Sequence, residues 1–88
     1  MKISSATLGL DYEVQELSQG MAEKLNEVLA DKSDLPSTRY EREFVNAART
    51  AGWIDCPMIT EDTPRKQTRW IFKRLFDQWQ DAQVVPND

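Results

Sequence analysis

The 88-residue sequence contains no histidine and a single cysteine, Cys56. Histidine is the commonest general base and transition-metal ligand, so Ser/His/Asp triads, Cys/His pairs and the usual zinc sites are excluded. No glycine-rich phosphate-binding motif or nucleophile-elbow motif occurs. The neighbouring acids Glu61 and Asp62 precede an expected helix, where carboxylates favour the helix dipole. We therefore predict a protein that is not an enzyme and that uses no metal or cofactor.

The sequence also lacks long apolar runs, Gly/Ser-rich linkers and internal repeats. It has no stretch of about 18 apolar residues for a membrane helix and no apolar segment near Met1 for a signal peptide. One cysteine cannot form an internal disulfide. We expect a cytoplasmic protein with no membrane association. Eight aromatic residues and 40% hydrophobic content favour a folded chain, and the length fits a single domain over residues 1–88.

The first predicted helix spans about residues 12–31, with Asp11 as its N-cap. It rests on apolar residues at spacings of three and four: Val14, Leu17, Met21, Leu25, Val28 and Leu29. Gly20 weakens this prediction because glycine disfavours helix interiors. The alternation of Leu8, Leu10, Tyr12 and Val14 with polar or small residues is typical of a strand over 2–14. We favour an extended arm up to Leu10 and leave the strand open.

Two further helices are predicted over about residues 38–51 and 64–82. Thr38 and Glu41 fit a capping box, and Gly52 fits the residue that follows a helix end. Thr63 and Pro64 fit the start of the third helix. The apolar segment 53–59 should fold over the core. These elements predict an all-α fold, a compact three-helix bundle with an extended N-terminal arm or a short strand.

Charge is unevenly distributed along the chain, whose formal net charge is −4. The last 24 residues hold five basic and three acidic side chains, whereas the rest is acidic. On the third predicted helix, Lys66, Lys73 and Arg74 surround Trp70 away from the apolar stripe. An exposed tryptophan among cations suits a binding hot spot, or a stacking platform for nucleic-acid bases. The alternative is that the N-terminal arm or segment 53–59 buries Trp70.

Acidic side chains provide a second candidate surface on the first predicted helix. They fall within a sector of about 80° on a helical wheel, and they are Glu13, Glu16, Glu23, Glu27 and Asp31. We select Glu16, Glu23 and Glu27 as candidate partner-binding residues. Such a stripe suits a basic partner or imitates the phosphate row of a duplex. The alternative is a solvated face neutralised by nearby bases.

These patterns predict a small non-enzymatic protein-binding module, such as an assembly chaperone, adaptor or inhibitor, acting through charged faces of the first and third helices. The alternatives are a nucleic-acid-binding domain using the third helix, an acidic nucleic-acid mimic, or a subunit completed by oligomerisation. The small size and the acidic isoelectric point near 4.8 are typical of phage or mobile-element accessory proteins. The sequence does not decide between a monomer and a homo-oligomer.

Overall fold

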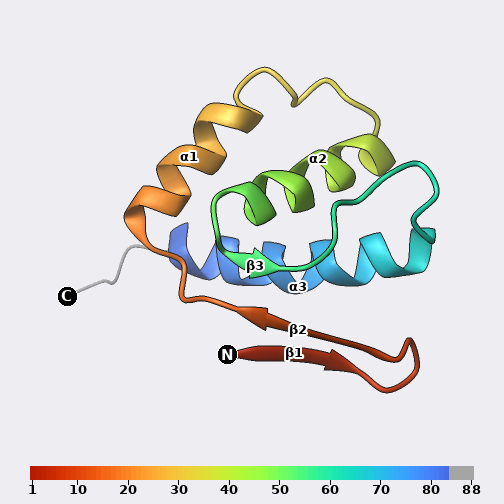
Figure 1. The fold of residues 1–88 in the computed structure, drawn as a ribbon. Helices are drawn as coiled ribbons and strands as arrows, with labels where there is room; N and C mark the ends of the chain where they lie inside the picture. Colours follow the sequence, from red (N-terminus) through yellow and green to blue (C-terminus); the bar gives the residue numbers. More distant parts are fainter. Residues whose placement is uncertain (84–88) are drawn as a thin grey trace.

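The chain folds as a β-hairpin followed by two helices, a short strand and a long helix (Figure 1). The structure is a computed structural model, and residues 1–83 are described here. The elements are β1 (Lys2–Ser5), β2 (Leu10–Val14), α1 (Gln19–Leu29), α2 (Ser37–Thr50), β3 (Ile54–Asp55) and α3 (Arg65–Gln83). The strands form one antiparallel sheet in the order β1-β2-β3. The prediction of an all-α fold is therefore wrong, because the protein is a mixed α+β structure.

Residues 2–14 form a hairpin. The sequence had predicted an extended arm followed by the first turns of a helix. β1 and β2 pair antiparallel with Ile3 opposite Tyr12, and Gly9 adopts a positive φ of 67° in the connection. Such a backbone conformation is readily adopted by glycine. Ile3 and Val14 are fully buried. The alternation around Leu10, Tyr12 and Val14 was thus the correct signal, and the helical spacing that starts at Val14 was misleading.

Helix α1 is shorter than predicted because its cap lies at Ser18. The Ser18 hydroxyl accepts a hydrogen bond from the Met21 amide at 3.2 Å, so the helix starts at Gln19. Asp11, the predicted cap, lies in β2, where its carboxylate pairs with Lys2 at 3.5 Å. The sheet and the cap both keep the segment before Ser18 out of the helix.

Helices α2 and α3 lie within one residue of their predicted bounds. Gly52 follows α2 with a φ of 83°, as the helix-end signal predicts. The predicted capping box is wrong, because Pro36 is the N-cap residue of α2 and makes no side-chain cap. Glu41 is instead buried against α3. Aromatic packing joins the two helices: the Phe44 ring lies 5.2 Å from that of Phe72 and 6.1 Å from that of Trp79.

Segment 53–59 packs over the core through four of its side chains, as predicted, whereas Asp55, Pro57 and Met58 are exposed. Trp53, Ile54, Cys56 and Ile59 are at most 6% exposed. Ile54 also pairs with Val14, so this segment adds the third strand to the hairpin. The sheet and the helices consequently share one core. Within the described residues 1–83, no helix is both long and apolar enough to cross a membrane.

Candidate partner-binding groove on helix α3

One face of α3 carries a hollow of about 460 Å³ that is open to solvent. We call it the α3 groove, and its lining residues are Lys66, Arg69, Trp70, Lys73, Arg74 and Asp77. Positions three and four apart on a helix lie on the same face, so the sequence of α3 alone brings these side chains together. Ile71 and Leu75 point the other way and are fully buried. The apolar stripe that fixes α3 on the core therefore also turns this cationic row outwards.

Trp70 is partly exposed, and it forms the aromatic wall of the groove. The Tyr12 ring of β2 lies 6.4 Å away at an interplanar angle of 42°. The Tyr12 hydroxyl accepts a hydrogen bond of 3.0 Å from Gln67, which fixes the ring beside α3. The alternative in which the N-terminal segment buries Trp70 therefore holds in part, because Tyr12 of β2 packs beside the indole. The indole is partly exposed and lines the groove.

The groove has a local excess of positive charge. Arg69 lies 3.5 Å from Glu41 and is partly neutralised by it. In the part of the chain that the structure describes, Lys66, Lys73 and Arg74 make no ion pair, and all three are exposed. Asp77 is the acid at one end. Cations that no internal acid neutralises can attract acidic groups of a partner, although salt screens such exposed charges.

The acidic candidates do not form one surface. Glu16 lies in the connection between β2 and α1, and it lines a separate hollow with Asp81. Glu23 and Glu27 lie on α1. The prediction of a single acidic helix face is wrong, since Glu13 belongs to β2 and Asp31 follows the end of α1.

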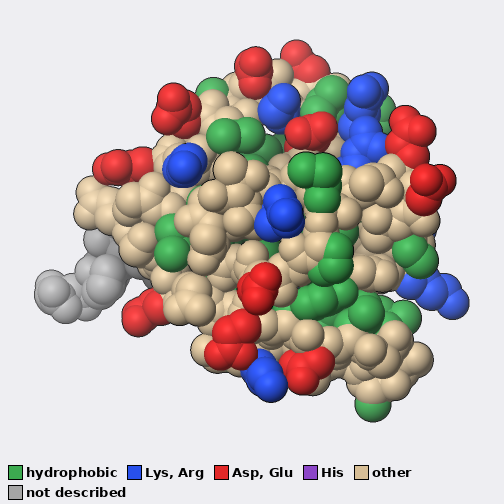
Figure 2. All heavy atoms as spheres, in the orientation of Figure 1, with side chains coloured by type: hydrophobic (Ala, Val, Ile, Leu, Met, Phe, Trp, Pro, Cys, Tyr) green, Lys and Arg blue, Asp and Glu red, His purple; other side chains and the backbone are tan. Residues whose placement is uncertain are grey.

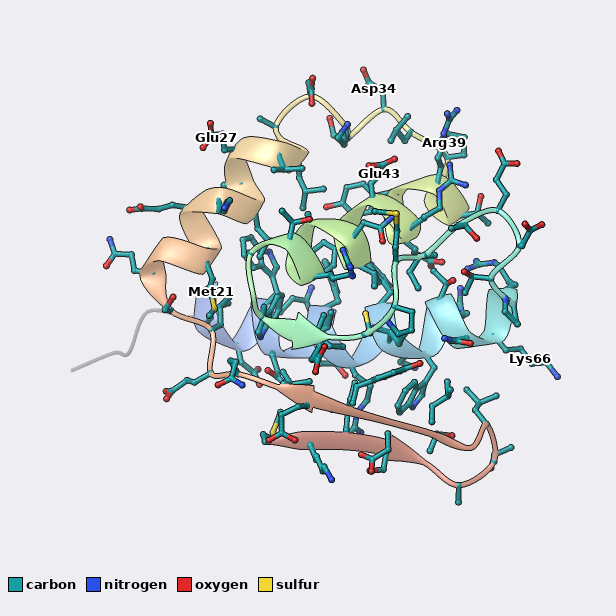
Figure 3. The ribbon with its side chains drawn as sticks, viewed as in Figure 1. Met21, Glu27, Asp34, Arg39, Glu43 and Lys66 are labelled. Atoms are coloured by element: carbon teal, nitrogen blue, oxygen red, sulfur yellow. The ribbon has the colours of Figure 1, made fainter. Side chains whose placement is uncertain are left out.

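The two predicted charged surfaces also lie far apart. Glu27 points to solvent from α1, whereas Lys66 lies at the opposite side of the molecule, at the start of α3 (Figure 3). In the space-filling view, acidic and basic side chains are interspersed on the visible face (Figure 2). Of the predicted partner-binding residues, the structure therefore brings together Lys66, Trp70, Lys73 and Arg74, and it leaves Glu16, Glu23 and Glu27 elsewhere.

Sequence reasoning missed three residues of this surface: Tyr12, Arg69 and Asp77. Arg69 pairs with Glu41 of α2 and also lines the groove. Its spacing from Lys66 and Lys73 was a usable signal for the groove. Tyr12 had no comparable signal, because its place beside Trp70 depends on a hairpin that packs against a helix more than 50 residues later.

Cys56 does not offer a reactive centre. Its side chain is buried, and burial raises the pKa of the thiol from 9.0 to about 11, with Asp55 adding to the rise and Arg49 opposing it. The thiolate is the nucleophilic form, so the thiol is poorly reactive near neutral pH. Among residues 1–83, no cluster of three or more Cys, Asp or Glu side chains is arranged to hold a metal ion.

No family model, curated protein or solved structure matches the chain. The function is therefore inferred from the α3 groove alone.

Proposed function

We propose that the chain is a small protein-binding module, of the assembly-chaperone, adaptor or inhibitor type, whose α3 groove takes an acidic segment of a partner protein. The observation that carries this proposal is a partly exposed Trp70 among three cations without an internal ion pair. Tryptophan and arginine are enriched at binding hot spots, because they combine a large contact area with directed hydrogen bonds. A cytoplasmic location is part of the proposal, and a phage or mobile-element origin stays a prediction.

The acidic candidates now play no part in this proposal. Their role as a phosphate mimic depended on one helical face, and the described residues do not form that face. The α3 groove, by contrast, needs a single helix and the hairpin beside it. The proposed binding surface is thus smaller than the one predicted from the sequence, and its charge is mainly positive.

The test is capture of partner proteins from extracts of the encoding organism by three forms of the chain. We expect a partner that the wild type and Lys24→Glu retain and that Lys73→Glu loses. Lys24 is an exposed lysine on α1, outside the groove, and provides the matched charge reversal. For the purified partner, Trp70→Ala should weaken binding by about 2 kcal/mol, or roughly thirtyfold in Kd. Equal capture by Lys73→Glu and Lys24→Glu would contradict the proposal.

Trp70→Phe separates loss of binding from loss of folding. Phenylalanine keeps a ring against Tyr12 while it reduces the indole surface in the groove. The helical circular-dichroism signal of each variant is compared with that of the wild type. A variant that keeps this signal and loses the partner reports on the groove itself.

Nucleic acid is the second candidate, because a base can stack on Trp70 while Lys66 and Lys73 contact phosphates. Against it stand the net charge of −4 and Asp77 in the groove, both of which repel a polyanion. Fluorescence anisotropy with labelled single-stranded and duplex DNA decides between the two. Salt-sensitive binding that Lys73→Glu abolishes and Lys24→Glu keeps would favour the nucleic-acid function.

A further inference from the structure

A second hollow lies where the start of α2 faces the loop before α3. It has a volume of about 390 Å³, and we call it the two-arginine hollow. Arg39 and Arg42 of α2 line one side, Thr60 and Glu61 of the loop line another, and Thr68 of α3 contributes to the lining. Arg39 lies at the start of α2 beside this loop in Figure 3. These residues are distinct from those of the α3 groove, so the inference goes beyond the proposed function.

The two arginines belong to a row of polar side chains along α2. Arg39, Arg42, Asn46 and Arg49 follow one another at spacings of three and four, which places them along one side of the helix. Asn46 accepts a hydrogen bond of 2.8 Å from the Ile59 amide and donates one of 3.0 Å to the Ile59 carbonyl. Arg49 donates to the Cys56 carbonyl at 2.9 Å. The second half of the row therefore holds segment 56–59 in place.

Arg39 and Arg42, the first half of the row, do not hold another segment in place. Within residues 1–83, neither Arg39 nor Arg42 forms a hydrogen bond through its side chain or an ion pair. Arg42 is partly buried, whereas Arg39 is exposed. Glu61 is the acid at the hollow, which leaves the two arginines in excess.

Thr68 supplies an independent observation that points to a ligand. Its side chain lies on the buried face of α3, and the residue is 5% exposed. Its backbone amide donates to the Pro64 carbonyl, but its hydroxyl has no partner in the described chain. Among residues 1–83, the polar side-chain atom that is fully enclosed and lacks a hydrogen-bond partner is Trp53 Nε1. The Thr68 hydroxyl is therefore not fully enclosed, and it is open to the hollow. A hydroxyl that has no partner in the protein and is open to the hollow is available to donate to a ligand there.

The start of α2 adds backbone donors. Pro36 makes no side-chain cap, so no side chain satisfies the first-turn amides that follow it. Free amides and the helix dipole favour an anion at this position. Guanidinium groups, hydroxyls and amides together form the donor set that tetrahedral oxyanions accept. Glu61 repels an anion, but the two arginines outweigh its charge.

We propose that the two-arginine hollow binds a phosphate group. Arg39 and Arg42 would neutralise its charge, and Thr68 would donate its hydroxyl to one oxygen. Inorganic phosphate and a phosphorylated side chain present the same chemistry, so both serve as probes.

The test is isothermal titration of the full chain with inorganic phosphate and, separately, with phosphoserine, at constant ionic strength set by chloride. We expect saturable binding of at least one probe to the wild type. Arg42→Gln should weaken it about tenfold, because a charge-assisted bidentate contact is lost. Thr68→Val keeps the shape of the side chain and removes the hydroxyl, so it should weaken binding severalfold while preserving the fold. Lys24→Gln, an exposed lysine on α1, is the control and should bind as the wild type does.

Binding of phosphoserine without binding of inorganic phosphate would identify an esterified phosphate as the ligand. Binding of both would show that the phosphate group suffices. Absence of saturable binding for both probes overturns the proposal. Equal affinity of the wild type and Arg42→Gln also overturns it, since the anion would then bind elsewhere.

Discussion

Glu41 shows how one buried carboxylate connects two helices. The residue is 6% exposed, and its carboxylate pairs with Arg65 and, at 3.5 Å, with Arg69. Both arginines are far more exposed than Glu41. Removing the acid therefore returns two cations to water, whereas removing the arginines leaves a buried charge without a partner. The second change should be the more destabilising one.

We predict that the double variant Arg65→Gln/Arg69→Gln loses about 3 kcal/mol of unfolding free energy, and that Glu41→Gln loses about 1 kcal/mol. Urea denaturation of each protein measures the two losses. Glu43→Gln, on the same helix and without an ion pair among residues 1–83, is the control. A larger loss in Glu41→Gln than in the double variant would show that the carboxylate is not the buried partner.

Cys56 makes the stability depend on pH in the alkaline range. Its pKa is raised by burial from 9.0 to about 11 in the folded protein. Between these pH values the unfolded chain ionises while the folded chain keeps its proton, so unfolding is coupled to proton release. The contribution of this thiol is therefore fully present below pH 9.0 and is lost as the pH rises to about 11.

We predict that the difference in unfolding free energy between the wild type and Cys56→Ala shrinks over this pH range. The measurement is urea denaturation of both proteins at several pH values. Burial also raises the pKa of Tyr12 above 10.0, and Cys56 adds to this rise. The difference therefore includes the coupling between Cys56 and Tyr12, which acts in the same direction, whereas the lysines are present in both proteins. A difference that stays constant with pH would mean that the folded thiol titrates normally.

At the scale of elements, sequence patterns predicted the two helices whose signals are local. Helix α2 has its end marked by Gly52, and α3 has its start marked by Pro64 and its apolar stripe marked by Ile71 and Leu75. The hairpin was missed because Val14 fits the helical period that it shares with Leu17 and Met21 as well as the end of a strand. Strand pairing between Ile3 and Tyr12 is a contact between separate segments, which periodicity within one segment does not encode.

The two candidate sites also differ in whether the sequence could predict them. The helical wheel of α3 was sufficient to group Trp70 with Lys66 and Lys73, because all three belong to one helix. The two-arginine hollow was not predicted, since it combines the start of α2, a loop and Thr68. Such a site needs the packing of α2 against α3, and the sequence does not give the relative position of two helices.

The hairpin is tested by a conservative change at its buried position. Ile3 is fully buried, whereas Ser4 is exposed. We predict that Ile3→Val lowers the unfolding free energy by about 1 kcal/mol, because it removes a buried methyl group. Ser4→Ala, its neighbour on the outer face, should change stability by less than about 0.5 kcal/mol. Equal effects in urea denaturation would support a solvated arm in place of β1.

At the scale of the whole molecule, the sheet and the helices depend on the same core. Val14 of β2 pairs with Ile54, and the Gln15 amide donates to the Trp53 carbonyl at 2.8 Å. Trp53 is fully buried, and its ring lies 6.2 Å from that of Phe44 in α2. Opening the hairpin therefore exposes Trp53, against which Phe44 of α2 packs. A chain of this size with one core should unfold in a single cooperative transition.

Native-state hydrogen exchange tests this coupling at two amides far apart in the chain. The Val14 amide donates to the Met1 carbonyl at 2.7 Å and reports on the hairpin, whereas the Phe44 amide lies inside α2. We predict that their opening free energies agree within about 1 kcal/mol, since both amides exchange through global unfolding. Exchange of Val14 with a much smaller free energy would mean that the hairpin opens alone. Tyr12 would then leave Trp70 while the helices stay folded, and the α3 groove would have an open form in which Tyr12 no longer covers the indole.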